Sequence, residues 1–357
     1  MPLDALPNEI LCLLPLFVNN IETFINAAAT CRRLRDAFLQ THSNTILRLA
    51  DASAPTFFSP QPYFLVAATA RQASDWALGH EERTQQLREA LRNGIDGLYD
   101  FCLQHSGLTL ARIRQIYLAR FSTINPMSDK IDKMAGDQWY STPSFWDGGV
   151  SEPYTIYTEA DRATFQIIIY GELFGRSMEA FLEPQRNLPF FDIPVRLDYW
   201  TYCVPDIGCR SYVGYEVLPV GPYAKGNEMM KNEDQFAMCY ILHCGRWRRM
   251  WAAAFRPALR ADFKDEDEDE EYWKKKMFRN AMQTQGLEGM QLITLPVEQV
   301  SPRYIEKVRR TKSQIVMLTE SPVVENLGSD GDTPVSRAPD PGMEVQVSIR
   351  SMWPCRR

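Results

Sequence analysis

The sequence predicts a mainly α protein, in which a three-helix N-terminal module precedes an irregular helical body with few short strands and a flexible C-terminal tail. Apolar residues recur at helical spacing in many short segments, and capping residues, prolines and glycines separate those segments. No repeat of about 20 to 50 residues is present, so a solenoid or propeller is not expected. We divide the chain into residues 1–50, 60–312 and 313–357.

The first predicted helix begins at Pro7. Proline suits the first helical position because its missing N–H has no helical partner there, and Glu9 complements the positive end of the helix dipole. Pro15 should stop or bend this helix. Its apolar residues lie almost all round it: Leu6, Ile10, Leu11, Leu13 and Leu14.

Two further helices are expected before residue 50. Asn19 and Glu22 form a loose capping box, with Asn19 as the N-cap. One apolar face then follows in each helix: Ile21, Phe24, Ile25 and Ala28, and afterwards Cys31, Leu34, Ala37 and Phe38. A unit of about forty residues is near the lower limit for independent folding. Its helices must therefore pack into the larger body or against a partner, and periodicity alone favours the body.

Leu6-Pro7-x-Glu9-Ile10-Leu11 and the closing Thr30-Cys31-Arg32-Arg33-Leu34 resemble an F-box over residues 3 to 48, in the style of filamentous fungi. The resemblance implies a three-helix module that docks on the Skp adaptor of SCF-type cullin–RING ubiquitin ligases. Pro15 departs from the family, which usually continues its first helix there, and Val18 replaces the usual leucine. The residues at the family's core and adaptor-facing positions are Leu6, Pro7, Ile10, Leu11, Leu14, Val18, Phe24, Ala28, Cys31 and Leu34.

By this resemblance the chain is a substrate receptor rather than an enzyme, and it needs no cofactor or metal. Its expected partners are the Skp adaptor, the cullin and a client protein that the body over 60–312 selects for ubiquitination. Two alternatives stay open: an F-box protein that acts outside a complete ligase, or a helical protein that binds a small molecule. The second would use an aromatic pocket that includes Trp139, Tyr154, Trp200 and Tyr212.

The composition and charge argue against a nucleic-acid-binding, membrane or secreted protein. The chain is 45% hydrophobic and 24% charged, with a net charge of −6 and a pI near 5.5. Neither nucleic acid nor an anionic membrane is expected as a partner, because there is no global basic charge. Asp4 and Glu9 do not fit a signal peptide, and no apolar run is long enough to span a bilayer. The dispersed cysteines favour a reduced cytoplasmic or nuclear protein.

The body begins with four predicted helices: 62–76, 81–93, 95–105, and one capped by Thr109. The buried stripe expected for the fourth is Leu110, Ile113, Ile116, Tyr117 and Phe121. Prolines, glycines and aromatic residues predict irregular structure over 122–157. A helix is expected from about residue 158 toward Phe181.

Residues 184–223 mix prolines with aromatic residues, and partial alternation favours one or two short strands there. A helix is expected within 229–256, and Arg246–Trp251 should give it an apolar tryptophan face and a basic face rather than a nucleic-acid groove. The acidic run 265–271 is interpreted as a solvated helix start, with an acidic patch for a basic partner as the alternative. Residues 319–342 are rich in Ser, Pro, Gly, Asp and Glu, which predicts flexibility.

Common catalytic motifs are absent from the sequence. It contains no GxSxG, P-loop, GxGxxG or HExxH, and none of its four histidines lies in a recognisable motif. Cys239, Cys244, His243 and Cys209 lack the spacing of common zinc sites. A Cys–His pair that meets only in space is still possible, but nothing in the sequence favours one.

Overall fold

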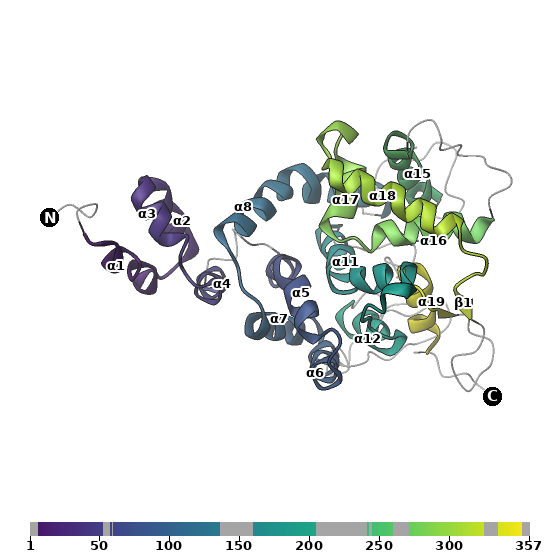
Figure 1. Cartoon of the computed structure of the whole chain (residues 1–357), viewed down its shortest axis with the longest axis horizontal. Coiled ribbons are helices and arrows are strands. Elements are labelled where there is room, and N and C mark those ends of the chain that lie inside the picture. The colour runs from purple at the N-terminus through teal and green to yellow at the C-terminus, as the bar shows by residue number, and fades with distance from the viewer. Residues whose placement is uncertain are drawn as a thin grey trace.

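The computed structural model describes residues 6–52, 58, 60–135, 160–204, 241–242, 245–259, 271–324 and 335–351. These residues are mainly helical, as predicted, and the only strands among them are two short ones. The N-terminal helices lie at one end of the molecule and the larger group of helices lies at the other end (Figure 1). Helices α4 to α8 lie between the two ends.

The N-terminal module consists of short helices. They are α1 (Asn8–Leu11), the 3₁₀ helix η2 (Leu14–Phe17), α2 (Ile21–Thr30) and α3 (Arg32–Phe38), and α4 (Ser43–Asp51) follows them. Pro15 is buried in the first turn of η2, so the expected break after the first helix is present. The cap of α2 is Asn20 rather than Asn19: its Oδ1 accepts a hydrogen bond of 2.8 Å from the Thr23 N–H.

Helix α4 joins this module to the body. The Leu108 N–H donates a 3.0 Å hydrogen bond to the Ser43 carbonyl at the start of α4, and the Tyr99 hydroxyl bonds Asp51 at its end. Gly107 lies so close to Ser43 that an added Cβ would overlap the serine side chain. The 106–109 segment is therefore held against α4, directly before α8 begins.

The next four helices confirm the predicted boundaries to within two residues: α5 (Tyr63–Ala77), α6 (Glu81–Arg92), α7 (Gly94–His105) and α8 (Leu110–Ala119). The Thr109 hydroxyl caps α8 by accepting from the Arg112 N–H at 3.1 Å. The predicted stripe is only partly correct, because Ile113 and Ile116 are buried whereas Tyr117 and Phe121 are exposed. Apolar spacing therefore predicted this helix correctly, but it did not predict which of its residues are covered by other helices.

The helix α11 (Ala160–Leu182) forms the centre of the body, and every residue from 163 to 175 is buried. It packs against α5, α9 (Asn125–Ala135), α16 (Tyr272–Gln283), α17 (Leu287–Thr294) and α18 (Pro302–Val316). The buried Glu172 links α11 to α5 and α17: it pairs with Arg71 of α5 at 2.7 Å and accepts from the Leu287 N–H of α17 at 3.1 Å.

Helix α15 (Gly245–Leu259) confirms the amphipathic interpretation of its sequence. Trp247 and Trp251 are fully buried, whereas Arg248 and Arg249 are exposed. Residues 229–240 of the expected helix and residues 265–270 of the acidic run lie outside the described residues. Glu271, the last acid of the run, is the N-cap of α16.

Several segments expected to be irregular are helical. The π-helix η3 (Arg120–Ile124) and α9 occupy 120–135. Helix α12 (Ile193–Cys203) lies where short strands were expected, after the 3₁₀ helix η4 (Pro184–Arg186). The two strands are instead β1 (Val323–Val324) and β2 (Val335–Ser336), which pair antiparallel. Two elements remain: the 3₁₀ turn η7 (Val297–Gln299) and α19 (Pro341–Ser351).

The prediction of a flexible tail over 313–357 is wrong for the segment 335–347, which is almost entirely buried. Helix α19 packs against α12, and Arg196 of α12 pairs with Glu344 of α19 at 2.6 Å. Both side chains are almost completely buried, and the Tyr170 hydroxyl bonds the same carboxylate. Burial raises the pKa of the Glu344 carboxyl to about 7, although Arg196 opposes this shift. Desolvation therefore offsets much of the attraction within the pair.

Among the described residues, no helix combines the length and apolar character that crossing a bilayer requires.

Gly171→Ala should destabilise the protein strongly. An added Cβ would overlap the backbone nitrogen and Cα of Gly286, and neither backbone can move without displacing α11 or α17. Overpacking of this kind costs about 1–3 kcal/mol. Gly245→Ala is the control, because within the described part of the chain its Cβ would meet only the ends of arginine side chains. Urea denaturation that finds the two variants equally stable would contradict the close packing described here.

Glu344→Ala should lower the free energy of unfolding by about 3–5 kcal/mol, because it leaves the buried Arg196 guanidinium without its charged partner. The double variant Arg196→Met/Glu344→Leu should be much less destabilised, since it removes both charges. Asp36→Ala is the control, because its ion pair with Arg32 is exposed. Equal losses in the single and double variants, measured by urea denaturation, would contradict this account.

Candidate docking surface

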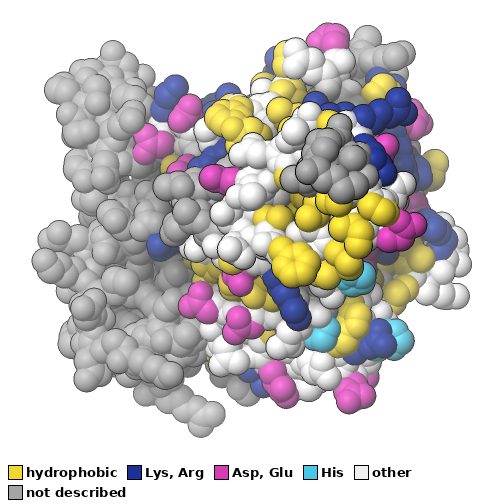
Figure 2. All heavy atoms as spheres, turned by 90° about the vertical axis from the view of Figure 1, so that its left-hand side faces the viewer, with side chains coloured by type: hydrophobic (Ala, Val, Ile, Leu, Met, Phe, Trp, Pro, Cys, Tyr) yellow, Lys and Arg dark blue, Asp and Glu magenta, His cyan; other side chains and the backbone are white. Residues whose placement is uncertain are grey.

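Large apolar side chains are exposed on the N-terminal module. Phe17 is 78% exposed and Leu16 is 64% exposed, and both extend from η2. Figure 2 shows hydrophobic side chains gathered near the middle of the face that this module presents. We call the exposed apolar residues of the module the docking face: Ile10, Leu13, Leu16, Phe17 and Leu39. Exposed apolar surface of this kind is typical of a protein–protein contact.

The docking face is held by a small internal core. Phe24 of α2 and Phe38 of α3 pack with their ring centroids 4.8 Å apart, and Leu11 of α1 is fully buried. The Arg33 Nε donates to Asn8 Oδ1 at 3.1 Å and links α3 to α1. The Cys31 Sγ accepts from the Leu34 N–H and caps α3. These contacts fix the position of the turns that carry Ile10 and Phe17.

The ten residues of the sequence-based set divide by exposure. Pro7 and Ile10 are exposed, so a partner can contact them directly. The half-buried members are Leu6, Leu14, Val18 and Cys31, and the buried members are Leu11, Phe24, Ala28 and Leu34. The buried group supports the module from within, and of its four members only Ala28 lines the groove described below.

Four residues of the docking face were not in that set: Leu13, Leu16, Phe17 and Leu39. Leu16 and Phe17 follow Pro15 directly, where a helical pattern was expected to stop. A signal was nevertheless present, because the apolar run continues past the proline. Pro15 is buried within the 3₁₀ helix η2, whereas Leu16 and Phe17 of the same helix are exposed.

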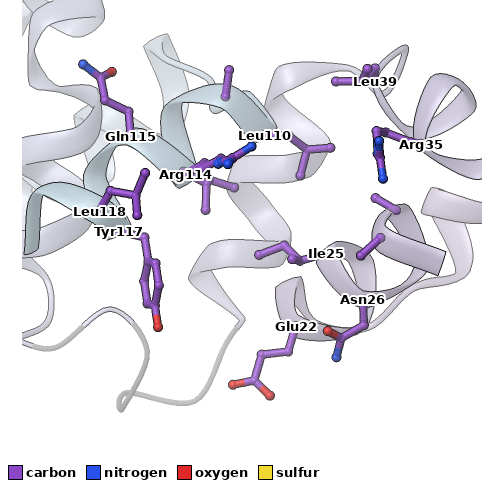
Figure 3. A pocket seen from close by; sticks show the side chains of 14 residues that line it. Glu22, Ile25, Asn26, Arg35, Leu39, Leu110, Arg114, Gln115, Tyr117 and Leu118 are labelled. Carbon is purple, nitrogen blue, oxygen red and sulfur yellow. The ribbon is translucent and has the colours of Figure 1, made fainter. Parts of the chain in front are cut away.

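A groove of about 1140 Å³ lies beside the docking face, between the module and the body. Helices α2 and α3 form one wall, and α8 forms the other. In Figure 3, Leu110, Tyr117 and Leu118 of α8 face Ile25 of α2. Leu39 belongs to both the docking face and the groove, so the two surfaces are continuous.

Other candidate sites gain little support. No cluster of His, Cys, Asp and Glu that could hold a metal ion occurs among the described residues, and Cys209, Cys239, His243 and Cys244 lie outside them. Trp139, Tyr154 and Tyr212 of the proposed aromatic pocket also lie outside the described residues. The remaining member, Trp200, is completely buried and packs on Tyr170 and Tyr199.

A second hollow, of about 490 Å³, lies between α11, α17 and α18. Its charged residues have both signs, and they partly neutralise one another: Glu179 pairs with Lys307 across it. Arg310 lies 3.9 Å from Glu183. This mixture gives no preference for one class of ligand.

Protein-family models, curated proteins and solved structures were compared with this chain, and none matches it significantly. Interpretation of the docking face therefore depends on its residues alone.

Phe17→Ser should leave the stability of the protein unchanged to within about 0.5 kcal/mol, because the side chain is mostly exposed. Phe24→Ala should cost about 3–5 kcal/mol, because its fully buried ring packs on Phe38. Urea denaturation of both variants tests the division of the module into face and core. A large loss in Phe17→Ser would show that Phe17 packs within the protein rather than being free for a partner.

Proposed function

We propose that this chain is a non-catalytic receptor that docks on the Skp adaptor of an SCF-type ubiquitin ligase and presents a client protein for ubiquitination. The exposed apolar docking face is the observation that carries the proposal. Residues 3 to 48 resemble an F-box, and residues of that motif such as Pro7 and Ile10 are exposed. The adaptor would cover the docking face and remove its apolar side chains from water.

The arrangement of the chain supports a role in positioning. The module lies at one end of the molecule, and the larger helical body extends away from it (Figure 1). The contacts of α4 with Leu108 and Tyr99 hold the module against the body. A client bound to the body would therefore keep a defined position relative to the adaptor and the cullin. The receptor would contribute proximity, and the bond chemistry would belong to the other ligase subunits.

Ile10→Ser/Phe17→Ser should weaken binding of a purified Skp-type adaptor by about thirtyfold, because each side chain is a large apolar anchor and each loss costs about 1 kcal/mol or more. Calorimetric titration of the full chain measures the affinity. Both residues are exposed, so the variant should fold normally. Met317→Ser on the far helix α18 is the matched control, because Met317 is 80% exposed and lies outside the module.

Two outcomes would contradict the proposal. One is that the wild-type chain fails to bind the adaptor. The other is that the double variant binds as tightly as wild type. Addition of the cullin then separates a ligase receptor from a protein that acts outside a complete ligase, because only the former carries the cullin into a ternary complex on gel filtration.

A further inference from the structure

The groove between α2, α3 and α8 is lined by apolar side chains that other described helices leave uncovered. Leu118 is 55% exposed, and Leu39 and Tyr117 are also exposed. Ile25 of α2 and Leu110 of α8 also line it and are half-buried. All of its walls are helices, so it offers no free strand edge to an extended peptide.

The size of the groove matches a short helix. An α-helix has a diameter of about 10 Å with side chains and a rise of 1.5 Å per residue, so about ten residues occupy 1140 Å³. Such a helix, of nearly three turns, would lie against α2 and α8 and present apolar residues at i, i+3, i+4 and i+7.

The charges on the groove favour an acidic occupant. Arg35 of α3 and Arg114 of α8 both line it, both are exposed, and in Figure 3 they flank Leu110. Neither has an ion-pair partner within the described part of the chain. Glu22 is the one acidic residue that lines the groove, so the lining carries two guanidinium groups and one carboxylate. Arginine suits such sites because its planar fork can bind a carboxylate through two hydrogen bonds.

We propose that this groove binds an amphipathic helix of a partner protein, whose apolar face is bordered by Asp or Glu side chains that pair with Arg35 and Arg114. The apolar face would cover Leu118, Tyr117 and Ile25. Because α8 belongs to the body and α2 to the module, one helix in this position would bind both parts and fix their relative position. The site lies beside the docking face but uses different residues, apart from Leu39.

A library of helix-forming peptides of about 16 residues, long enough to fill the groove, tests the proposal when it is selected on the full chain. Enriched peptides should combine the i, i+3, i+4, i+7 apolar pattern with flanking Asp or Glu. The best peptide, labelled with a fluorophore, should lose at least about tenfold in affinity for Leu118→Glu and for Arg35→Glu/Arg114→Glu, as measured by fluorescence anisotropy. Its Lys-for-Glu counterpart should bind the double variant better than it binds wild type.

Matched controls are Met317→Glu and Arg32→Glu, because both residues are exposed and neither lines the groove. The proposal fails if enriched peptides carry no acidic bias, if none is enriched, or if the groove variants bind the peptide as tightly as the controls do. It also fails if the wild-type chain forms a dimer that Leu118→Glu abolishes, because a second copy would then be the occupant. These readouts do not use the Skp adaptor, so they are independent of the test on Ile10 and Phe17.

Discussion

The fold depends on the burial of α11 along most of its length. Its residues 163 to 175 are all buried, so neighbouring helices must cover them on every side. This is possible only because Gly171 admits the backbone of Gly286, and because Glu172 is neutralised by Arg71 and hydrogen-bonded to Leu287. A buried carboxylate without such partners would be very costly. The helices that pack on α11 thereby fix the body to which α4 and the module are attached.

The N-terminal module obeys a different constraint, which is its size. Its short helices bury Leu11, Phe24 and Phe38, but they are too few to cover Leu16 and Phe17 as well. The body does not supply the missing cover, because α4 and the 106–109 segment hold the module to one side of it. The exposed apolar face therefore results from the way the module is attached, and this is why a partner protein is the natural interpretation of the surface.

The sequence predicted the helices that have clear apolar periodicity, as in α5, α6 and α8, and in α8 the side chain of Thr109 also caps the helix. It failed for α9, where Pro126 lies within a helical run that continues from α8 through η3. It also failed for two helices that carry a proline in the first turn: α12 with Pro194 and α19 with Pro341. Those prolines were interpreted as breaks, although proline is favoured at the start of a helix. Asp192 and Asp340, whose side chains accept from Val195 and Met343, were the caps that could have distinguished a start from a break.

The two exposed surfaces show why a single sequence does not locate a binding site completely. Periodicity predicted that Ile113 and Tyr117 of α8 and Phe121 of η3 are all buried, but only Ile113 is buried. Burial of the other two depends on elements far along the chain. An apolar stripe on a helix does not specify which other element packs against that stripe. The same argument applies to Ile10 and Leu11 of the module: both are apolar and adjacent in the sequence, but Ile10 is exposed and Leu11 is buried. An apolar residue can belong to a docking surface only when the rest of the fold leaves it uncovered. Here the contacts that attach α4 to the 106–109 segment leave both the docking face and the groove beside it uncovered.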